Sequence, residues 1–335
     1  MRRDATYPRL NNLNFAIINA MTIKRICMIG GTGFVGSHIA HQLVERGYDV
    51  RVLTRDRERA KHLLVLPSAE VIAANVHDPA ELARQFSGID AVINLVGILH
   101  ESRKNSFHSA HVQLTQKILD ACDAAGVKRV LHMSALAATA DAPSAYLRSK
   151  AEAEKRVIAF QQAGFAETTI FRPSVIFGQG DSFINLFAKL IKTLPLIALA
   201  CPNARFQPIH VEDVARAFVD SLDQARTFGQ AYDLCGPKIY TLRELVALIA
   251  ALLGKRRPII GLGNRLSYLQ AWFMEWLPVK LMTRDNYYSM QVDSVCNCEF
   301  PFDFTPSTLE SIVPAYLASA ALRSKYALFR NRAGR

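Results

Sequence analysis

A glycine-rich turn constrains the fold of this chain more than any other feature. The stretch IGGTGFVGSHIA places Gly30, Gly33 and Gly36 at three-residue spacing, and Gly31 completes the form G-x-G-x-x-G. The turn follows the short apolar run RICMIG and precedes residues with helical spacing. A strand, a tight turn and a helix N-terminus in this order bring backbone N–H groups close to a pyrophosphate. The pattern therefore predicts a dinucleotide-binding βαβ unit.

Strands and helices alternate through the first half of the chain. Short apolar runs indicate strands, and apolar residues at helical spacing indicate helices. Strands are expected at residues 25–30, 49–55, 70–76, 90–97, 127–134 and 167–173, with helices at 34–46, 57–64, 79–86 and 107–125 and around 144–155. Right-handed crossovers between such strands give one parallel sheet with helices on both faces. We therefore predict an α/β fold, a Rossmann-type doubly wound parallel sheet.

The order of elements loosens beyond about residue 176. Helices are expected near residues 181–193, 211–223, 241–253 and 263–277, separated by turns with glycine or proline. Half of the 335 residues are hydrophobic, which is enough for a packed core. We divide the chain into a disordered extension at 1–22, a dinucleotide-binding Rossmann domain at 23–176, a smaller, mostly helical C-terminal lobe at 177–320 that is partly woven back into the first domain, and a basic tail at 321–335.

The positive charge is concentrated at the two ends of the chain. The formal net charge is +11, of which the first 25 residues carry +4 and the last 15 carry +5. The body between them is close to neutral, whereas a nucleic-acid surface needs a basic stripe on the fold itself. We therefore expect no nucleic-acid partner. The basic tail is either a solvated end or a contact for an anionic membrane surface or an acidic protein.

Cysteine spacing does not indicate a metal site. The six cysteines form no C-x-x-C motif, and the pair Cys296 and Cys298 lacks a second pair of ligands. His210, Glu212 and Asp213 also resemble metal ligands, but the dipole of a helix that starts here explains the two acids. Scattered thiols in apolar runs are typical of a reducing, cytoplasmic compartment.

No segment of the chain is apolar enough to be expected to span a membrane. The stretch FINLFAKLIKTLPLIALACP is interrupted by Lys189, Lys192 and Pro195, and residues 1–20 lack the apolar core of a signal peptide. We expect a cytoplasmic protein that is either soluble or peripheral on the inner face of the membrane.

One stretch of the lobe, LGNRLSYLQAWFMEWLPVKL, is rich in large apolar side chains. They recur at helical spacing at Leu266, Leu269, Trp272, Phe273, Trp276 and Leu277. The ordinary explanation is a helix that faces the core, and we expect one here. The alternatives are a hydrophobic binding groove and a membrane-surface face, because such anchors beside basic residues suit an interface.

The end of the second strand bears on the choice of cofactor. An acid there accepts hydrogen bonds from a ribose 2′-OH, whereas a basic residue accommodates a 2′-phosphate. This chain has Thr54 and then Arg55, with Arg57 nearby and no acid at the strand end itself. The pattern favours NADP(H), with NAD(H) as the alternative if Arg55 is only a surface residue.

Three polar residues are candidates for chemistry at a nicotinamide. Tyr146 and Lys150 stand four residues apart in SAYLRSKAEAEK and so share one helix face. A nearby ammonium lowers the pKa of a phenol. Ser134 ends a predicted strand at the carboxyl edge of the sheet, where open α/β sheets bind their ligands. The alternative is an incidental pair on an ordinary helix.

The glycine loop, Ser134 and Tyr146-x-x-x-Lys150 occur in an order that resembles the short-chain dehydrogenase/reductase superfamily, in its extended or atypical, epimerase/dehydratase-like branch. Further stretches are similar to one subgroup, the bacterial proteins related to the NADPH-binding accessory subunit of respiratory complex I. They are INLVGIL, KRVLHMSAL, YLRSKAEAE, FRPSVIFGQGDSF, QPIHVEDVA, YDLCGP-x-x-YTLRELV and DNYYSMQVDSV. The similarity extends from about residue 24 to residue 317.

The resemblance implies a role for each candidate residue. Tyr146 would be the acid–base group, Lys150 would lower its pKa and hold the cofactor ribose, and Ser134 would orient a substrate carbonyl. The same resemblance, together with the loop, predicts that the cofactor is lined by Gly30, Gly31, Thr32, Gly33, Phe34, Val35, Gly36, Thr54, Arg55, Asn75, Val76, Leu95, Val96, Gly97, Met133, Tyr146, Lys150, Pro173, Val175 and Ile176.

Three positions depart from the family pattern. Asn75 stands where an aspartate near the adenine is frequent, His111 where an active-site asparagine is common, and Gly97 where many epimerases have alanine. Arg172 in FRPSVIFG is expected to be buried, either near the nicotinamide or as a packed structural residue. These departures leave it open whether the Tyr–Lys–Ser set catalyses a reaction or only lines the nucleotide.

Three functions follow from these observations. The leading hypothesis is a protein that carries NADP(H) as a structural or redox-sensing cofactor in respiratory-complex or quinone-related function. The second is an active NADP-dependent oxidoreductase that uses Tyr146, Lys150 and Ser134 on an apolar carbonyl or quinone-like small molecule. The third, a sugar-nucleotide epimerase or dehydratase, fits less well because the lobe is so apolar.

Overall fold

A seven-stranded parallel sheet forms the centre of the molecule, in a computed structural model that describes residues 23–102, 105–277 and 281–317. The strand order is β11-β6-β5-β4-β1-β2-β3, and every neighbouring pair is parallel. The strands are β1 (Arg25–Ile29), β2 (Asp49–Thr54), β3 (Ala69–Ala73), β4 (Ala91–Asn94), β5 (Arg129–Met133), β6 (Glu167–Pro173) and β11 (Gln230–Leu234). The predicted Rossmann-type doubly wound sheet is confirmed. The predicted extension and the basic tail lie outside the described residues.

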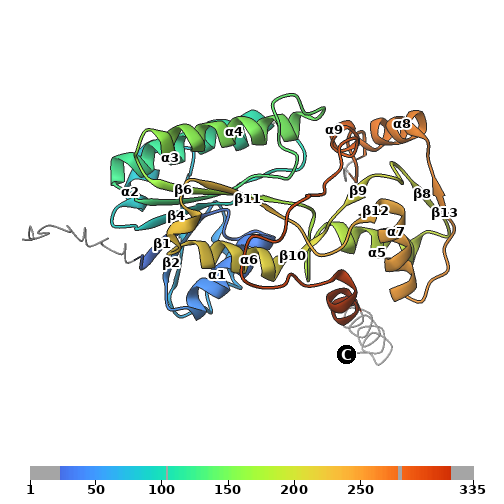
Figure 1. The fold of residues 1–335 in the computed structure, drawn as a ribbon, viewed down its shortest axis with the longest axis horizontal. Helices are drawn as coiled ribbons and strands as arrows, with labels where there is room; N and C mark the ends of the chain where they lie inside the picture. Colours follow the sequence, from blue (N-terminus) through green and yellow to red (C-terminus); the bar gives the residue numbers. More distant parts are fainter. Residues whose placement is uncertain (1–22, 103–104, 278–280, 318–335) are drawn as a thin grey trace, which may run out of the picture.

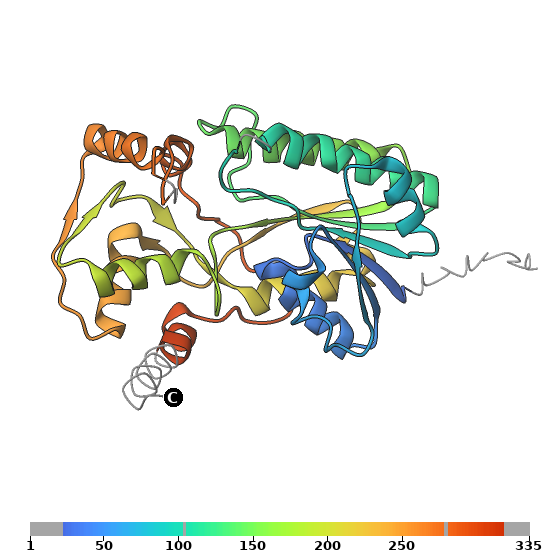
Figure 2. The same ribbon diagram turned by 180° about the vertical axis from the view of Figure 1, so that it is seen from behind.

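Helices cover both faces of this sheet, as Figures 1 and 2 show from opposite sides. One face carries α2 (Pro79–Phe86), α3 (Leu114–Ala125) and α4 (Ala145–Gln162), and the other carries α1 (Phe34–Glu45) and α6 (Val211–Ser221). The central strand β4 is buried at every position, as expected for a parallel sheet with two covered faces. A parallel sheet places the carboxyl ends of its strands at one edge, and the candidate residues lie there.

Several elements are shorter than the sequence predicts. The helix expected at residues 57–64 is only a 3₁₀ turn, η1 (Arg57–Ala60), in which the Asp56 side chain accepts a hydrogen bond from the Glu58 N–H. Ala60 and Leu63 are the buried hydrophobic residues of this segment, too few for the apolar stripe that holds a helix on a sheet. The predicted helix at 107–125 begins instead with the π-helical segment η2 (His108–Gln113) and continues as α3.

The smaller lobe contains helices and short strand pairs. Its helices are α5 (Phe183–Thr193), α7 (Leu242–Leu252), α8 (Asn264–Met274) and α9 (Arg284–Ser289). Three strand pairs accompany them: β7 (Ile176–Phe177) with β10 (Ile209–His210), β8 (Ile197–Leu199) with β13 (Ile259–Gly261), and β9 (Arg205–Phe206) with β12 (Tyr240–Thr241). Two later elements, α6 and β11, pack with the first domain although they follow residue 176 in the chain.

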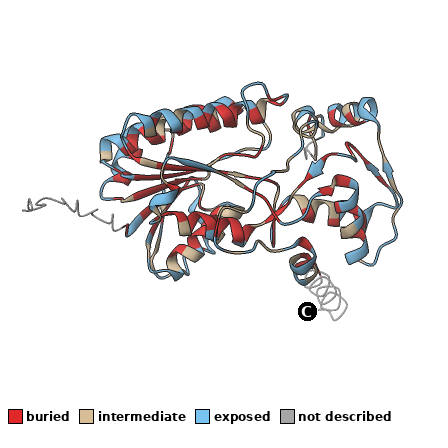
Figure 3. Ribbon diagram, in the orientation of Figure 1, coloured by how far each residue is buried: buried red, intermediate tan, exposed pale blue. Residues whose placement is uncertain are grey.

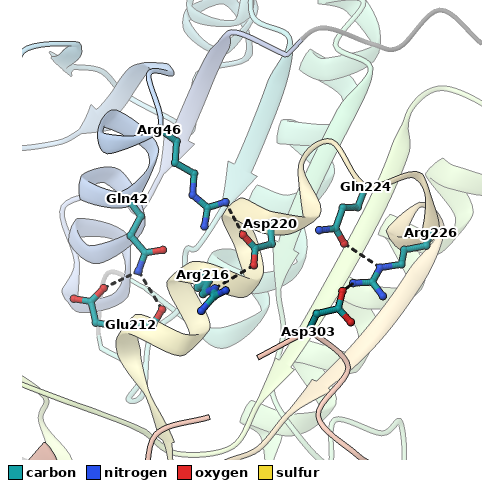
Figure 4. A network of polar contacts seen from close by, with 8 residues as sticks. All are labelled: Gln42, Arg46, Glu212, Arg216, Asp220, Gln224, Arg226 and Asp303. Atoms are coloured by element: carbon teal, nitrogen blue, oxygen red, sulfur yellow. Dashed lines mark hydrogen bonds and ion pairs between the residues drawn. The ribbon is translucent and has the colours of Figure 1, made fainter. Parts of the chain in front are cut away.

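Polar contacts fasten α6 to the helix that follows the glycine loop (Figure 4). Gln42 on α1 binds Glu212 on α6 at 2.7 Å, and Arg46, the C-cap residue of α1, binds Asp220 on α6 at 2.5 Å. Glu212 also lies 2.5 Å from His38 Nδ1, and Asp213 accepts a hydrogen bond from a backbone N–H. Beyond α6, η3 (Ala225–Thr227) brings Arg226 to Asp303. Glu212 and Asp213 occupy the first turn of α6, as the helix-start interpretation requires.

The expectation of a core-facing helix at residues 263–277 is wrong. Only Ser267 and Ala271 of α8 are buried, whereas Phe273 and Trp276 are 63% and 76% exposed. Figure 3 shows this helix at the outer edge of the lobe with much of its surface exposed. The helix packs on its lobe through the small side chains of Ser267 and Ala271, so the face that carries the large apolar side chains lies on the outside as a hydrophobic surface.

Within the described residues, no helix is long and apolar enough to cross a membrane, and no three side chains of the metal-binding types cluster as a metal site. All six cysteines are free, and four of them are buried.

Candidate dinucleotide site

The glycine loop between β1 and α1 has the geometry of a phosphate cradle. Gly30 has a φ of +83°, and its carbonyl accepts a hydrogen bond of 3.1 Å from the Gly33 N–H. A Cβ atom on Gly36 would lie 2.5 Å from both Gly30 O and Gly31 Cα, so only glycine allows the helix to pack this closely. Glycine is therefore required at position 30 by the backbone conformation and at position 36 by close backbone contacts.

The first turn of α1 is open to an anion. Gly33 occupies the N-cap position, where it provides no side-chain acceptor, and the first turn contains no acid. The N–H groups at a helix start lack partners within the helix and lie at the positive end of its dipole. Thr32, Phe34 and Val35 are half-buried beside this turn. The loop thus fits the pyrophosphate of a dinucleotide.

Strands β2 and β3 end beside the position expected for the adenosine half. Thr54 is buried, and Arg55 is exposed just after it. Asn75 accepts a hydrogen bond from the His77 N–H at 3.1 Å, and Val76 is buried. Burial, followed by Lys117 and Arg55, lowers the pKa of the His77 imidazole. Arg55 therefore contributes positive potential at this corner.

Lys150 points from α4 toward the ends of β4 and β5. It is 3% exposed, and its ammonium donates hydrogen bonds to Met133 O at 3.0 Å and Val96 O at 3.4 Å. A Cβ atom on Gly97 would lie 3.4 Å from Nζ, an ordinary contact distance, so Gly97 lies directly beside the ammonium. Burial lowers the pKa of Lys150 to about 8, and the Glu154 carboxylate partly opposes this shift.

Ser134 has a buried hydroxyl that finds no hydrogen-bond partner among the described residues, although its N–H donates to Phe171 O at 2.7 Å. A buried hydroxyl without a partner costs free energy, and such groups are rare in folded proteins. Ser134 immediately follows β5, whose last residue, Met133, accepts the Lys150 hydrogen bond. Its hydroxyl is therefore available to a ligand at the carboxyl edge of the sheet.

Tyr146 lies in the first turn of α4, half-buried among aromatic rings. Its ring meets those of Phe107 and His111 edge-on, with centroids 5.9 Å and 5.6 Å away. Burial, followed by the Asp285 carboxylate, raises the pKa of Tyr146 to about 12. Asp285, which belongs to α9 of the lobe, accepts hydrogen bonds from the Ala145 and Tyr146 N–H groups at 2.7 Å and 3.2 Å.

His111 fills the position where the resemblance places an asparagine. Its Nε2 accepts a hydrogen bond of 3.0 Å from the Ile98 N–H, so the neutral ring carries its hydrogen on Nδ1. Nδ1 lies 2.8 Å from Ser149 Oγ, which donates in turn to Tyr146 O at 2.7 Å. Burial, with Lys150 and then the buried His132 as weaker causes, lowers the pKa of His111 to about 2. The imidazole therefore stays neutral and holds two backbone segments together.

The end of β6 turns past the same edge of the sheet. Pro173 is buried and its carbonyl accepts from the Leu136 N–H, while Val175 and Ile176 are half-buried. Arg172 forms an ion pair with Glu154 of α4 and is 31% exposed, so it is less buried than expected. The ion pair supports the structural role for Arg172.

A pocket of about 540 Å³ lies between the segment that precedes η2 and the helices α8 and α9. Phe107, which contacts the Tyr146 ring, and Asp285, which caps α4, both belong to its wall. It is lined by His100, Glu101, Phe107, Trp272, Glu275, Trp276, Thr283, Arg284 and Asp285. The sequence did not single out Phe107 or Asp285 for this site, because Asp285 lies 139 residues from Tyr146 in the chain.

Comparisons with known proteins agree with this geometry. The chain is 33% identical over 231 residues to NADH dehydrogenase [ubiquinone] 1 alpha subcomplex subunit 9 of Arabidopsis thaliana, and 32% identical over 228 residues to that of Mus musculus. Each match covers 66% of this chain, but only 56% of the plant protein and 59% of the mouse protein. The predicted similarity to the accessory-subunit subgroup is thus confirmed.

A solved structure, the dTDP-glucose 4,6-dehydratase DesIV of Streptomyces venezuelae with NAD bound, matches with a TM-score of 0.62 at 25% identity. The match covers 71% of this chain and 84% of that one. Residues 26–235 also match the family model described as the NAD dependent epimerase/dehydratase family. The glycine cradle, the buried Lys150 and the free Ser134 hydroxyl therefore lie in a chain that belongs to the NAD dependent epimerase/dehydratase family and binds a nicotinamide dinucleotide.

Proposed function

We propose that this protein holds NADP(H) as a structural or redox-sensing cofactor in respiratory-complex or quinone-related function. One contrast supports the proposal: the glycine loop fits a pyrophosphate, whereas the groups around Tyr146 do not prepare it for proton transfer. Its pKa is raised to about 12, whereas an acid–base group works best with a pKa near the working pH. Lys150 could oppose this shift, but its hydrogen bonds go to the Met133 and Val96 carbonyls.

The similarity to the two mitochondrial subunits supports a respiratory complex as the setting. Their names assign them to an NADH dehydrogenase that uses ubiquinone. The chain spans less than two thirds of the length of these relatives. Association of this chain with a respiratory complex is therefore a proposal.

Arg55 supports NADP(H) over NAD(H). It is exposed after β2, and the Asp56 carboxylate beside it already accepts a hydrogen bond from Glu58 N–H. An arginine fork can hold a 2′-phosphate by charge-assisted hydrogen bonds worth about 1.5–3 kcal/mol, roughly a 10- to 100-fold change in affinity. Titration calorimetry with NADPH and NADH tests this preference. We expect Arg55→Gln to weaken NADPH binding by that factor and to leave NADH binding unchanged, while Arg84→Gln on the exposed side of α2 changes neither.

The role of the cofactor is tested on the purified protein. Any nucleotide that copurifies is identified, and the absorbance of bound NADPH is followed with a panel of quinones and aldehydes. We expect NADPH to stay bound and reduced. Steady turnover that Tyr146→Phe abolishes, with the cofactor still bound, would overturn the structural role in favour of an enzyme.

The pocket beside Tyr146 favours an oxidoreductase as the second candidate. Trp272, Trp276 and Phe107 give it an aromatic wall, and the free Ser134 hydroxyl is available for a substrate carbonyl. In such a reaction bound NADPH would supply the hydride to the carbonyl carbon. Tyr146 would pass its proton to the carbonyl oxygen, and Lys150 would stabilise the phenolate that remains. An apolar carbonyl or quinone-like molecule fits these walls better than a sugar nucleotide does.

The outer face of α8 supports a membrane surface as the site of action. A groove of about 410 Å³ runs along it, lined by Leu262, Leu266, Leu269, Gln270, Trp272 and Phe273. The lobe segments 183–204 and 241–277, the second of which includes α8, contain seven lysines and arginines but only two acids. Apolar and aromatic anchors within a basic surface suit the interface of an anionic bilayer. We propose that α8 lies in that interface.

A further inference from the structure

The carboxylate of Asp285 joins two parts of the fold that are far apart in the chain. Both of its oxygens accept hydrogen bonds at the start of α4, from Ala145 N at 2.7 Å and from Tyr146 N at 3.2 Å. Ser144 caps the next N–H, that of Leu147, at 3.2 Å. The first turn of α4 is therefore satisfied partly by the lobe rather than by its own residues. Figure 1 shows α9 beside this end of α4.

The residue before Asp285 connects α9 to the end of α8. Arg284 donates twice to Glu275, the C-cap residue of α8, from its backbone N–H at 2.6 Å and from Nε at 2.8 Å. The rings of Tyr268 on α8 and Tyr287 on α9 meet edge-on at 5.5 Å. The two helices thus form one unit, and Asp285 is the residue of α9 that binds α4.

We propose that Asp285 is a positioning residue for Tyr146: it ties the first turn of α4 to the α8–α9 unit, so that the position of this unit sets the environment of the phenol. The α8 face that we assign to a membrane is therefore connected to the dinucleotide site by three residues, Glu275, Arg284 and Asp285. A membrane that binds α8 or moves it also moves the Asp285 carboxylate, which is a negative charge beside Tyr146. The inference rests on the proposed function at two points, that Tyr146 faces the cofactor and that the exposed face of α8 meets a membrane.

Titratable groups approach Tyr146 from three elements, and the charged side chains of Glu101 and Arg284 line the neighbouring pocket with Phe107 and Asp285. Lys150 lies one turn further along α4, His111 faces the ring from η2, and Asp285 approaches from α9. His111 stays neutral, and the Lys150 ammonium donates to carbonyls at the sheet edge. Asp285 is the negative charge among these three, so its removal has a predictable sign: ionisation of Tyr146 becomes easier.

The experiment measures Tyr146 itself in the full chain without cofactor. Tyrosine labelled with carbon-13 at the ring ζ position reports ionisation by NMR, and Tyr146→Phe identifies the signal. We expect Asp285→Asn, which keeps one acceptor oxygen, to lower the titration midpoint of Tyr146 by about one pH unit. Asp303→Asn, an exposed carboxylate paired with Arg226, is the matched control and should leave the midpoint unchanged.

Coupling through α8 is tested by Glu275→Gln. If the α8–α9 unit holds Asp285 in place, this change lowers the Tyr146 midpoint in the wild-type background and adds nothing in the Asp285→Asn background. An unchanged midpoint in Asp285→Asn overturns the positioning role, and an effect of Glu275→Gln that persists without Asp285 overturns the coupling. NADPH affinity is measured separately by calorimetry. A failure to bind NADPH contradicts the proposed cofactor and does not bear on the role of Asp285.

Discussion

At the scale of single residues, the site consists of buried groups whose protonation is set by their surroundings. His111 and His132 are both almost fully buried near the Lys150 ammonium. Burial is the main cause, and Lys150 the next, that lowers the pKa of His111 to about 2 and that of His132 to about 3. Neutral imidazoles are compatible with a stable cationic lysine here, whereas charged imidazoles are not. The departure from asparagine at His111 therefore keeps a hydrogen-bonding role and adds no charge.

These histidines make the protein sensitive to acid. In the unfolded chain they take up protons below about pH 6.5, whereas in the fold they stay neutral until about pH 2–3. Between these values the unfolded state binds more protons than the fold. The free energy of unfolding therefore decreases as the pH is lowered, by up to about 1.4 kcal/mol per pH unit for each histidine. Urea unfolding at pH 7 and pH 5 measures this slope. We expect His111→Asn to reduce it, and a slope equal to that of wild type would contradict the neutral, buried state.

The matched control is His41→Asn. His41 lies on the exposed side of α1, so its replacement should leave the pH dependence unchanged.

At the scale of elements, α8 is the helix whose burial the sequence did not predict. Periodicity shows that apolar residues share one side of a helix, but it does not show what covers that side. The helix touches its lobe through Ser267 and Ala271, and large apolar side chains remain outside. In the segment 57–64, by contrast, the predicted helix does not form, because too few of its residues are buried. Contacts with the rest of the molecule decided both outcomes.

The exposed face of α8 yields a prediction about lipid binding. We expect the full chain to float with vesicles that contain anionic lipid and to float less with neutral vesicles or at high salt. Replacing Trp272, Phe273 and Trp276 by serine should abolish flotation without unfolding the protein, because these side chains are exposed. Serine at Leu64 and Val65, exposed apolar residues on the first domain, is the control. Equal flotation of both variants would contradict the membrane face.

At the scale of the whole molecule, segments distant in the chain complete the first domain. Strand β11 extends the sheet beside β6, and α6 packs beside α1, although both follow the first half of the lobe in sequence. Arg129 of β5 is fully buried where these segments meet and donates to the carbonyls of Ser221 and Leu222 and to the hydroxyl of Thr227. Its guanidinium also lies 4.5 Å from the Phe228 ring centroid.

Arg129 should therefore be essential for joining the two halves of the chain. We expect Arg129→Met to lower the free energy of unfolding by about 3–5 kcal/mol, because it leaves several buried acceptors without a donor. Arg129→Lys should recover only part of the loss, since an ammonium cannot reproduce the planar fork. Chemical denaturation measures both variants, and Arg216→Met, an exposed residue of α6, is the control. A loss below about 1 kcal/mol for Arg129→Met would show that the junction is held by other contacts.

The sequence by itself determined the parallel sheet, the glycine cradle and the family, because these depend on local patterns: apolar runs, glycine spacing and a helix with Tyr146 and Lys150 one turn apart. Strand ends were predicted to within a few residues for the same reason. Only the tertiary structure decided what surrounds these residues. It brought Asp285 to the start of α4, left the Ser134 hydroxyl without a partner among the residues that the structure describes, and exposed α8. Such contacts join residues more than a hundred positions apart or depend on how much surface the neighbours can cover, and no local pattern records either.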